Sequence, residues 1–359
     1  MACHGHRYGS GRRICEVRLQ GRRLHAERQS ISPLGAPVSQ QDFAIGIDIG
    51  GGSTKIGLVS TGGEIIERRR VVVGDTDDAD TIVAQYAETV RDILGAHPAA
   101  RVLGIGIGFP GRIHPDNLSG DLGNIPALDD FPLAERIGGL FSLPARMEND
   151  GTAAGLAEAM FGKDRAARRL LLIAAGTGIG VALTIDGKPF ITSGGGLGNA
   201  GQLIIHGSDG RPCRQGCVGC LESLASGDAL NGIARRYCVE VPDSPLARRA
   251  SDHGREADAS DVIATALAGD AAARAMLSDV GRWLGRGAAT WAQIFAPDVI
   301  LLGGGLSAAG NLLLAPLERE ARLSGLDLYL APVRFALASL GNDAGIIGAA
   351  AQIFPTPKP

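Results

Sequence analysis

Apolar residues along the chain gather in short runs that end at glycines, and this pattern begins at Phe43. The run FAIGIDIG (43–50) is rich in β-branched residues and continues into further glycines, which predicts a buried strand that enters a turn. KIGLVS (55–60) and EIIERRRVVV (64–73) predict two more strands with a turn between them. RVLGIGIGFPG (101–111) predicts another buried strand, which runs into a Gly-Pro turn.

Helical spacing of apolar residues follows these strands. Residues 77–94 have an acidic start and predict a helix, and residues 133–141 predict a shorter one. Up to residue 141 the expected order is therefore β-β-β-α-β-α. A short strand is expected at 146–149, followed by an Ala-rich helix at 151–161 that Asp150 opens.

The second half of the chain repeats the opening pattern. Residues 168–189 contain an apolar strand, a Gly-Thr-Gly turn, a second strand and an Asp-Gly hairpin. The repeat predicts an α/β protein of two duplicated domains that face a cleft, at 42–150 and 151–359. The remaining expected elements are helices at 221–238, 258–268 and 271–295, strands at 297–306 and 326–335, and a closing helix at 344–353.

Composition narrows the class of protein. A length of 359 residues suits two domains, and 45% hydrophobic with 20% charged residues describes a globular protein. The net charge of −3 argues against a nucleic-acid partner, because such proteins usually carry a basic excess. The sequence contains no apolar run of the roughly 18 residues that a membrane helix needs. We therefore expect a cytoplasmic protein with neither nucleic acid nor membrane as partner.

Residues 1–41 differ from the rest of the chain. They carry many arginines, few acidic residues and no sustained apolar period, which predicts a disordered basic extension. An over-long gene prediction with the native start near Val38, or a basic tail that binds a partner, would give the same pattern. A secretory signal is not expected, because no apolar segment follows the arginines.

Three glycine turns, each at the end of an expected buried strand, give the strongest chemical signal. A phosphate group needs several converging backbone N–H groups, and glycine lets the chain approach it without a Cβ in the way. The turns do not fit the P-loop or the Rossmann glycine pattern. The candidate phosphate- and nucleoside-binding residues are Asp48, Gly50, Gly51, Gly52, Ser53, Thr54, Lys55, Gly176, Thr177, Gly178, Gly303, Gly304 and Gly305.

Together these motifs resemble a known family. DIGGGSTK, GIGIGFPG, NIP, MENDGTAAGLAE, AAGTGIG, the cysteine segment and DVILLGGG occur in the order typical of the repressor/open-reading-frame/kinase (ROK) family. The resemblance covers Phe43 to about Phe354 and implies two duplicated actin-like (ribonuclease H-like) domains. It also implies a homodimeric, ATP- and Mg²⁺-dependent kinase that phosphorylates a primary hydroxyl of a small sugar-like polyol.

The same resemblance implies roles for individual residues. Asp150 matches the general base, although a helix-capping aspartate is the simpler explanation for an isolated Asn-Asp pair. Asp48 matches the carboxylate that orients magnesium and the phosphates. The expected substrate-binding residues are Asn124, Asn149, Asp150, Gln202 and Glu222.

The segment from Asn199 to Glu222 departs from the family pattern of a structural zinc site. Ile205 stands where the family has its histidine, and Gln215 replaces the middle cysteine. A cysteine cluster in a reducing compartment favours a metal or local structural role over a disulfide framework. Two alternatives remain open here: no zinc, or a rebuilt tetrahedral site. The ligands of the rebuilt site would be Cys213, Cys217, Cys220 and His206.

The substrate also remains open. Gln202 replaces a family glutamate, and Ile205 adds an apolar surface, so some glucose hydroxyls would lack partners. This favours a C7-cyclitol of the 2-epi-5-epi-valiolone type or an unusual amino sugar. The alternatives are a glucokinase or hexokinase that uses ATP or polyphosphate, and a non-catalytic ROK sugar sensor or regulator. A DNA-binding regulator would need a helix-turn-helix, which residues 1–41 do not predict.

Overall fold

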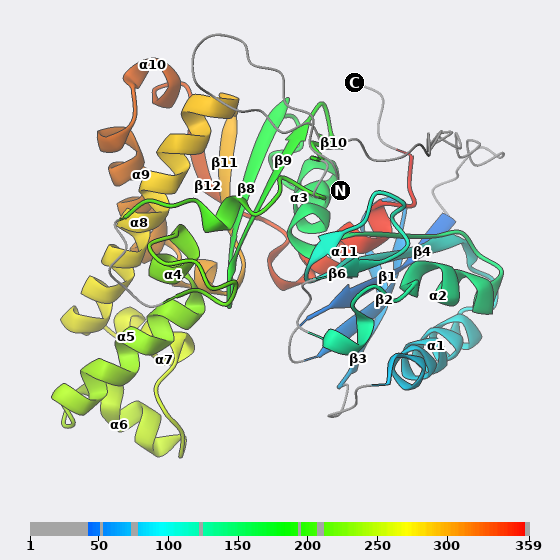
Figure 1. Ribbon diagram of the computed structural model, residues 1–359, viewed down its shortest axis with the longest axis horizontal. Coiled ribbons are helices and arrows are strands. Elements are labelled where there is room, and N and C mark those ends of the chain that lie inside the picture. Colours follow the sequence, from blue (N-terminus) through cyan, green and yellow to red (C-terminus); the bar gives the residue numbers. More distant parts are fainter. Residues whose placement is uncertain are drawn as a thin grey trace, which may run out of the picture. The chain divides into compact units, whose positions relative to one another are not determined.

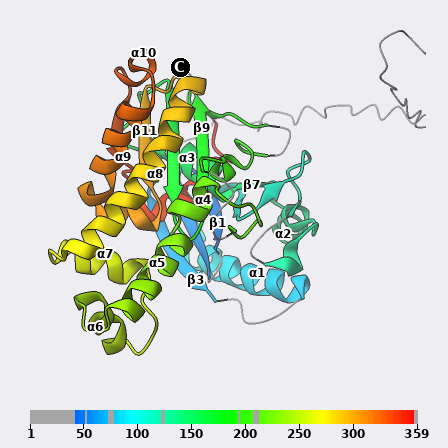
Figure 2. The same ribbon diagram turned by 60° about the vertical axis from the view of Figure 1, so that its left-hand side comes forward.

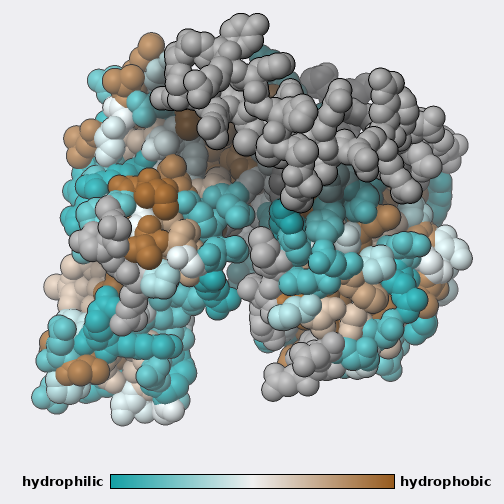
Figure 3. Space-filling view, in the orientation of Figure 1, coloured by the Kyte–Doolittle hydropathy of each residue, from teal (hydrophilic) through white to brown (hydrophobic). Residues whose placement is uncertain are grey.

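The computed structural model describes residues 42–50, 53–72, 78–121, 125–192, 195–206 and 212–355 (Figure 1). The predictions for the extension at 1–41 and for Gly51, Gly52 and Asn124 fall outside these residues. The described chain contains two five-stranded sheets and a two-stranded ribbon. In Figure 3 hydrophilic residues predominate on the described surface, and hydrophobic residues show mostly as small patches.

The first sheet has the strand order β3-β2-β1-β4-β7. β1, β2 and β3 pair antiparallel, whereas β1, β4 and β7 run parallel, so the carboxyl ends of these three strands meet at one edge. The strands are β1 (Asp42–Ile49), β2 (Thr54–Ser60), β3 (Ile65–Val71), β4 (Arg101–Phe109) and β7 (Ala145–Asn149).

Helices cover both faces of the first sheet, because alternate residues of its central strands are apolar on both sides. One face packs against α1 (Ala79–Ala96) and α2 (Leu133–Phe141). The other packs against α3 (Asp150–Phe161) and the closing helix α11 (Ala344–Ala351). Gly106 lets α11 approach closely, since a Cβ there would lie 1.7 Å from the Ala349 carbonyl oxygen.

The second sheet repeats the arrangement of the first, with the strand order β10-β9-β8-β11-β12. β8 and β9 form the second hairpin, as the repeated sequence pattern predicts. β11 pairs parallel with β8 on one side and with β12 on the other. The strands are β8 (Arg169–Ala175), β9 (Ile179–Ile185), β10 (Lys188–Pro189), β11 (Val299–Gly303) and β12 (Arg334–Leu337).

A group of helices packs on the second sheet through one continuous apolar core. α8 and α9 lie side by side in both ribbon views (Figure 1, Figure 2), and Gly281 and Gly285 of α8 allow this close approach. No helix of the described residues is long and apolar enough to cross a bilayer. The helices are α4 (Leu221–Ala225), α5 (Gly227–Glu240), α6 (Pro245–Asp252), α7 (Ala259–Leu267), α8 (Ala271–Phe295), α9 (Asn311–Ser324) and α10 (Asp327–Leu330).

Two sequence predictions need correction, and two helices were missed. The helix predicted at 221–238 is two helices, because the Ser226 hydroxyl accepts a hydrogen bond from the Ala229 N–H and starts α5 there. The strand predicted at 326–335 is wrong: α10 occupies its first half, and β12 begins only at Arg334. α6 and α9 were not predicted. Pro316 lies inside α9, and an internal proline normally argues against a helix.

The division at residue 150 stays a prediction, because α3 contacts both sheets. Gly155 of α3 faces Ala182 of β9, where an added Cβ would lie 2.6 Å from the Ala182 Cβ. On the opposite side Ala153 meets Gly348 of α11, where a Cβ would lie 1.9 Å from the Ala153 carbonyl oxygen. α3 therefore connects the first sheet, the second sheet and the end of the described chain.

Candidate active site

A cleft of about 450 Å³ is lined by residues from both sheets. It brings together most residues that the sequence analysis selected from distant segments. Of that set, Asp48, Gly50, Lys55, Asn149, Asp150, Gly176, Thr177, Gly178, Gln202, Glu222, Gly303 and Gly304 line the cleft. Ser53, Thr54 and Gly305 do not line it.

Two carboxylates flank the carboxyl end of β4. Asp48 is the next-to-last residue of β1 and pairs in register with Gly108 of β4, and Asp150 follows directly after β7. A Cβ at Gly108 would lie 3.8 Å from the Asp150 Cα and 3.9 Å from Asp48 Oδ1. Because Gly108 has no side chain, nothing from β4 separates the two acids.

Asp150 is held by its neighbours and has an altered acidity. Its Oδ1 accepts hydrogen bonds from the Gly151 N–H (2.7 Å) and the Asn149 Nδ2 (3.1 Å). Burial raises the pKa of Asp150 to about 6, and the negative charge of Asp48 contributes to the rise. A carboxylate with such a pKa can accept a proton near neutral pH.

Asn149, and not Asp150, caps helix α3. The Asn149 Oδ1 accepts a hydrogen bond from the Thr152 N–H at 3.1 Å. Its Nδ2 donates to the Gly111 carbonyl oxygen (3.0 Å) as well as to Asp150. The residue that caps the helix is therefore Asn149, and capping does not explain Asp150. The amide hydrogens of Asn149 already form hydrogen bonds within the protein.

Asp48 lies beside the ammonium group of Lys55 and close to the segment that leads into α11. Burial raises the pKa of Asp48, and Lys55, whose Nζ lies 3.3 Å from Oδ2, lowers it. Lys55 also donates to the Asn342 carbonyl oxygen at 3.1 Å, which places it beside the segment that leads into α11. The site thus offers one carboxylate and one ammonium group at the end of the first hairpin.

The Gly176–Gly178 turn is supported from behind by α4 and α5. The Gly227 N–H donates to the Gly176 carbonyl oxygen at 2.7 Å. Glu222 of α4 accepts a hydrogen bond from the Ile179 N–H at 2.9 Å. Its Oε2 lies 2.5 Å from the place that a Cβ at Gly178 would take, so a side chain there would displace the Glu222 carboxylate.

The third glycine turn lies beside the second one. Gly303 of β11 pairs in register with Ala174 of β8. Gly304 has φ +78°, and a Cβ there would lie 2.5 Å from the Ala175 carbonyl oxygen. The close approach and the backbone conformation both require glycine, as expected for a turn whose backbone faces a ligand.

Thr54 is a correction to the predicted phosphate-binding set. Its hydroxyl is fully buried and lies 2.7 Å from the Tyr86 hydroxyl of α1, so it belongs to the core of the first sheet. The Ser53 hydroxyl accepts a hydrogen bond from the Arg70 Nε at 2.7 Å. The alternation of strand β2 explains the result, because Thr54 and Lys55 point to opposite faces.

Sequence reasoning missed Glu158, which lines the cleft and is fully buried. Its Oε1 accepts a hydrogen bond from the Leu340 N–H (2.7 Å), and its Oε2 accepts one from the Ser339 hydroxyl (2.9 Å). Glu158 therefore ties α3 to the loop that carries Asn342. Its place on the same helix as Asp150 was visible in the sequence, but its partners lie far along the chain.

The cyclitol hypothesis depended on two substitutions, Gln202 and Ile205, and the structure places only the first of them in the cleft. Gln202 lines the cleft. Ile205 does not line it and instead packs against the core of the second sheet, while the adjacent Ile204 is 60% exposed. The inference from Ile205 was therefore wrong, because this residue faces the protein core and not the ligand space.

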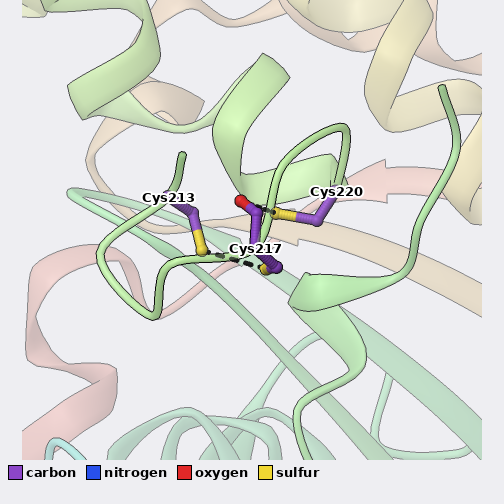
Figure 4. A group of neighbouring side chains, drawn as sticks. All are labelled: Cys213, Cys217 and Cys220. Carbon is purple, nitrogen blue, oxygen red and sulfur yellow. Dashed lines mark hydrogen bonds between the residues drawn. The ribbon is translucent and has the colours of Figure 1, made fainter. Parts of the chain in front are cut away.

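The four predicted zinc ligands do not form one site. The sulfurs of Cys213, Cys217 and Cys220 lie within 4.8 Å of one another (Figure 4), and His206 is not in this group of the described residues. The His206 ring packs against Trp283, with ring centroids 5.5 Å apart. The Cys213 and Cys217 sulfurs are 3.1 Å apart, whereas two thiolates on tetrahedral zinc lie about 3.8 Å apart. Among the described residues three of the four expected ligands come together, and His206 does not complete the Cys₃His set.

The duplicated sheets and the cleft between their glycine turns define a phosphotransferase with an alcohol group as acceptor, built on the actin-like fold. The chain belongs to the ROK family, which matches residues 44–354. The family resemblance derived from the motifs is thereby confirmed.

Relatives of known name include both kinases and repressors. The glucokinase of Halalkalibacterium halodurans is 32% identical over 308 residues, which cover 85% of this chain and 92% of that protein. A putative xylose repressor of a Caldicellulosiruptor species is 29% identical, covering 86% of this chain and 77% of that protein. The ROK family glucokinase from Streptomyces griseus in complex with glucose and AMPPNP superposes with a TM-score of 0.75 at 28% identity, covering 86% of this chain and 98% of that one.

Proposed function

We propose that this protein is an ATP-dependent hexose kinase that transfers the γ-phosphoryl group to a primary hydroxyl, with glucose as the preferred acceptor. The observation that carries the proposal is the position of Asp150, a carboxylate with a pKa of about 6, in the cleft that the glycine turns line. The named glucokinases among the relatives, and the glucose and AMPPNP in the Streptomyces griseus structure, support both substrates.

Asp150 is the proposed general base. Phosphoryl transfer requires the acceptor hydroxyl to lose its proton as it attacks, and a carboxylate with a pKa near neutrality can take that proton. The hydrogen bonds from Gly151 and Asn149 fix Oδ1, so Oδ2 remains for the acceptor hydroxyl. Asn149 thus acts mainly by orienting the base.

The donor phosphates are proposed to bind along the glycine turns, in which the N–H groups of Gly50 and Gly176 already donate to the carbonyl oxygens of Ser53 and Gly178 and so hold the turns in shape. Gly50, Gly176 and Gly304 line the cleft from three strand ends, and Lys55 supplies a positive charge. Magnesium, when bound, neutralises phosphate charge, and Asp48 is the residue that would hold it. A site that preorganises these groups lowers the barrier by position and charge.

The acceptor is proposed to lie between Asp150 on one side of the cleft and the two residues Gln202 and Glu222 on the other. Both Gln202 and Glu222 line the cleft and offer hydrogen-bonding groups for ring hydroxyls. One oxygen of Glu222 accepts from the Ile179 N–H, so its position is set by the second sheet. A polyol whose ring hydroxyls contact Gln202 and Glu222 would be oriented with its primary hydroxyl at Asp150.

A coupled assay of ADP formation over a panel of sugars tests the proposal. We expect the highest kcat/KM for glucose among glucose, mannose, N-acetylmannosamine, xylose and a C7-cyclitol. Turnover of the cyclitol with a higher kcat/KM would refute the glucose preference. Binding of a sugar without ADP formation would refute the kinase and indicate a sugar-responsive regulator. Polyphosphate in place of ATP tests the donor.

Three further sequence predictions remain proposals: the homodimer, the cytoplasmic location and the lack of a nucleic-acid partner. Sedimentation velocity of the purified chain tests the first, and we expect a dimer. An electrophoretic mobility assay with genomic DNA fragments tests the third. The presence of repressors among the relatives makes this assay informative, and we expect no shift at physiological salt.

A further inference from the structure

Cys213 and Cys217 face each other across a tight hairpin at the edge of the cleft. Pro212 and Val218 form an antiparallel bridge, and the Cys213 N–H donates to the Cys217 carbonyl oxygen at 2.9 Å. Three residues close the hairpin, and the last of them, Gly216, has φ +87°, as a three-residue loop requires. The backbone therefore sets the two cysteines opposite each other.

The backbone pairing of the two cysteines suits a covalent bond between their sulfurs. Residues opposite each other in an antiparallel pair have Cα atoms about 4.5–5.5 Å apart, inside the range of about 4.4–6.8 Å that disulfides use. The sulfurs are 3.1 Å apart, so a movement of about 1 Å reaches the disulfide length of about 2.05 Å. A shared zinc would require the same sulfurs to move apart by about 0.7 Å, so the preference for the disulfide rests on the hairpin pairing and on the absence of His206 from this group of the described residues.

Cys220 differs from the other two cysteines. It is fully buried, and its sulfur accepts a hydrogen bond from the Ser223 N–H at 3.4 Å, as the cap of α4. Cys213 and Cys217 are both partly exposed. Figure 4 shows the dashed contact between the Cys213 and Cys217 sulfurs, with Cys220 on the far side of Cys217. An oxidant from solvent would therefore reach the Cys213–Cys217 pair first.

We propose that Cys213 and Cys217 form a reversible disulfide. Two S–H bonds break and one S–S bond forms, and the two electrons and two protons pass to hydrogen peroxide, whose O–O bond breaks to give two water molecules. A small thiol reverses the step by disulfide exchange. The pair replaces the zinc site that the ROK family pattern implies, in which Ile205 and Gln215 now occupy ligand positions.

The disulfide would act on the wall of the cleft, because the hairpin tip carries two residues that line it. Arg214 and Gln215 lie between the two cysteines and both line the cleft. The Arg214 Nε donates to the Asp228 carboxylate at 2.7 Å. The Asp228 N–H donates to the Thr177 carbonyl oxygen at 3.2 Å. Closing the S–S bond would therefore shift side chains that line the acceptor space and touch the phosphate-binding turn.

Non-reducing peptide mapping of the full chain after treatment with hydrogen peroxide tests the proposal. We expect a Cys213–Cys217 cross-link that dithiothreitol removes, and loss of two thiols per chain in a thiol titration. Cys238→Ala keeps the cross-link and serves as the control, whereas Cys217→Ser abolishes it. Free Cys213 and Cys217 thiols after treatment, or one tightly bound zinc per chain by metal analysis, would overturn the proposal.

A second measurement tests the link to the cleft, and this part rests on the proposed kinase function. Oxidation should raise the KM for glucose by roughly three- to tenfold, because small displacements of contacting groups weaken binding strongly. Reductant should restore it, and the Cys217→Ser chain should not respond. An unchanged KM in fully cross-linked protein overturns the link. Because the cross-link is read by mass, it can be found in a protein without kinase activity.

Discussion

Gly345 lies directly against Asp48: a Cβ added at position 345 would lie 2.3 Å from the Asp48 Oδ2. Gly345 belongs to the first turn of α11, near the end of the described chain, whereas Asp48 lies next to the end of the first strand. The carboxylate proposed to hold magnesium is therefore positioned by a helix that the chain adds last.

Gly345→Ala should lower kcat/KM for ATP by about tenfold or more, because Asp48 must move to admit the methyl group. Steady-state kinetics with ATP and glucose varied in turn measure the effect. Gly139→Ala is the matched control, since no atom lies within 4 Å of a Cβ at this exposed position of α2. The control should retain activity and gain about 0.5–1 kcal/mol of stability. Equal activity of the two variants would show that Asp48 is not placed by this contact.

Asp150→Asn should reduce kcat by about 10²–10⁴-fold, because the amide keeps the size of the side chain but cannot take a proton. Nucleotide affinity, measured by isothermal titration calorimetry, should stay nearly unchanged, since the phosphate-binding turns are intact. A parallel loss of nucleotide binding would mean that Asp150 is structural.

The raised pKa of Asp150 predicts a characteristic dependence on pH. Activity should rise through about pH 6, as the base loses its proton, and level off above it. Between the ordinary pKa of 3.8 and about 6 the folded state binds more protons than the unfolded state, so stability falls as the pH rises. Asp150→Asn should therefore have a higher Tm than the parent at pH 8, and the difference should shrink towards pH 4. A difference that does not change with pH would refute the burial of this charge.

Removing the contacts of Glu158 should loosen the loop of Ser339 and Leu340, which lies beside the proposed nucleotide site. Glu158→Ala removes both acceptor oxygens, leaves the Leu340 N–H without its partner and should cost about 1–3 kcal/mol of unfolding free energy, with a raised KM for ATP. Denaturant melts and kinetics measure the two effects. Ser339→Ala should show the same change in KM at a smaller cost in stability. Ser324→Ala, which removes only an exposed contact of 3.5 Å, is the control and should change neither.

Gln202 and Ile205 should differ in their effect on the acceptor. Gln202→Ala should raise the KM for glucose by roughly tenfold, because its side chain lines the cleft. Ile205→Ala should leave this KM unchanged and lower the Tm, since Ile205 packs against the core of the second sheet. The opposite result would restore a role for Ile205 in substrate choice.

The sequence alone determined the strand-turn-strand repeat, the glycine turns and the acid beside β7. These features are local: β-branched runs, glycines and a capped helix specify a backbone over a few residues. The position of Asp150 at a strand end followed from this, because parallel strands bring their carboxyl ends to one edge. The family match followed from the order of the same local motifs.

Tertiary structure decided which of these residues share a space. The direction of the Thr54 hydroxyl depends on Tyr86 of a separate helix, and the burial of Ile205 depends on the core of the second sheet. The contacts of Glu158 with residues near 340, and of Asp48 with Gly345, join segments that no local pattern relates. Packing between distant segments is set by the shape and volume of the whole core, so a linear pattern of polar and apolar positions does not contain it.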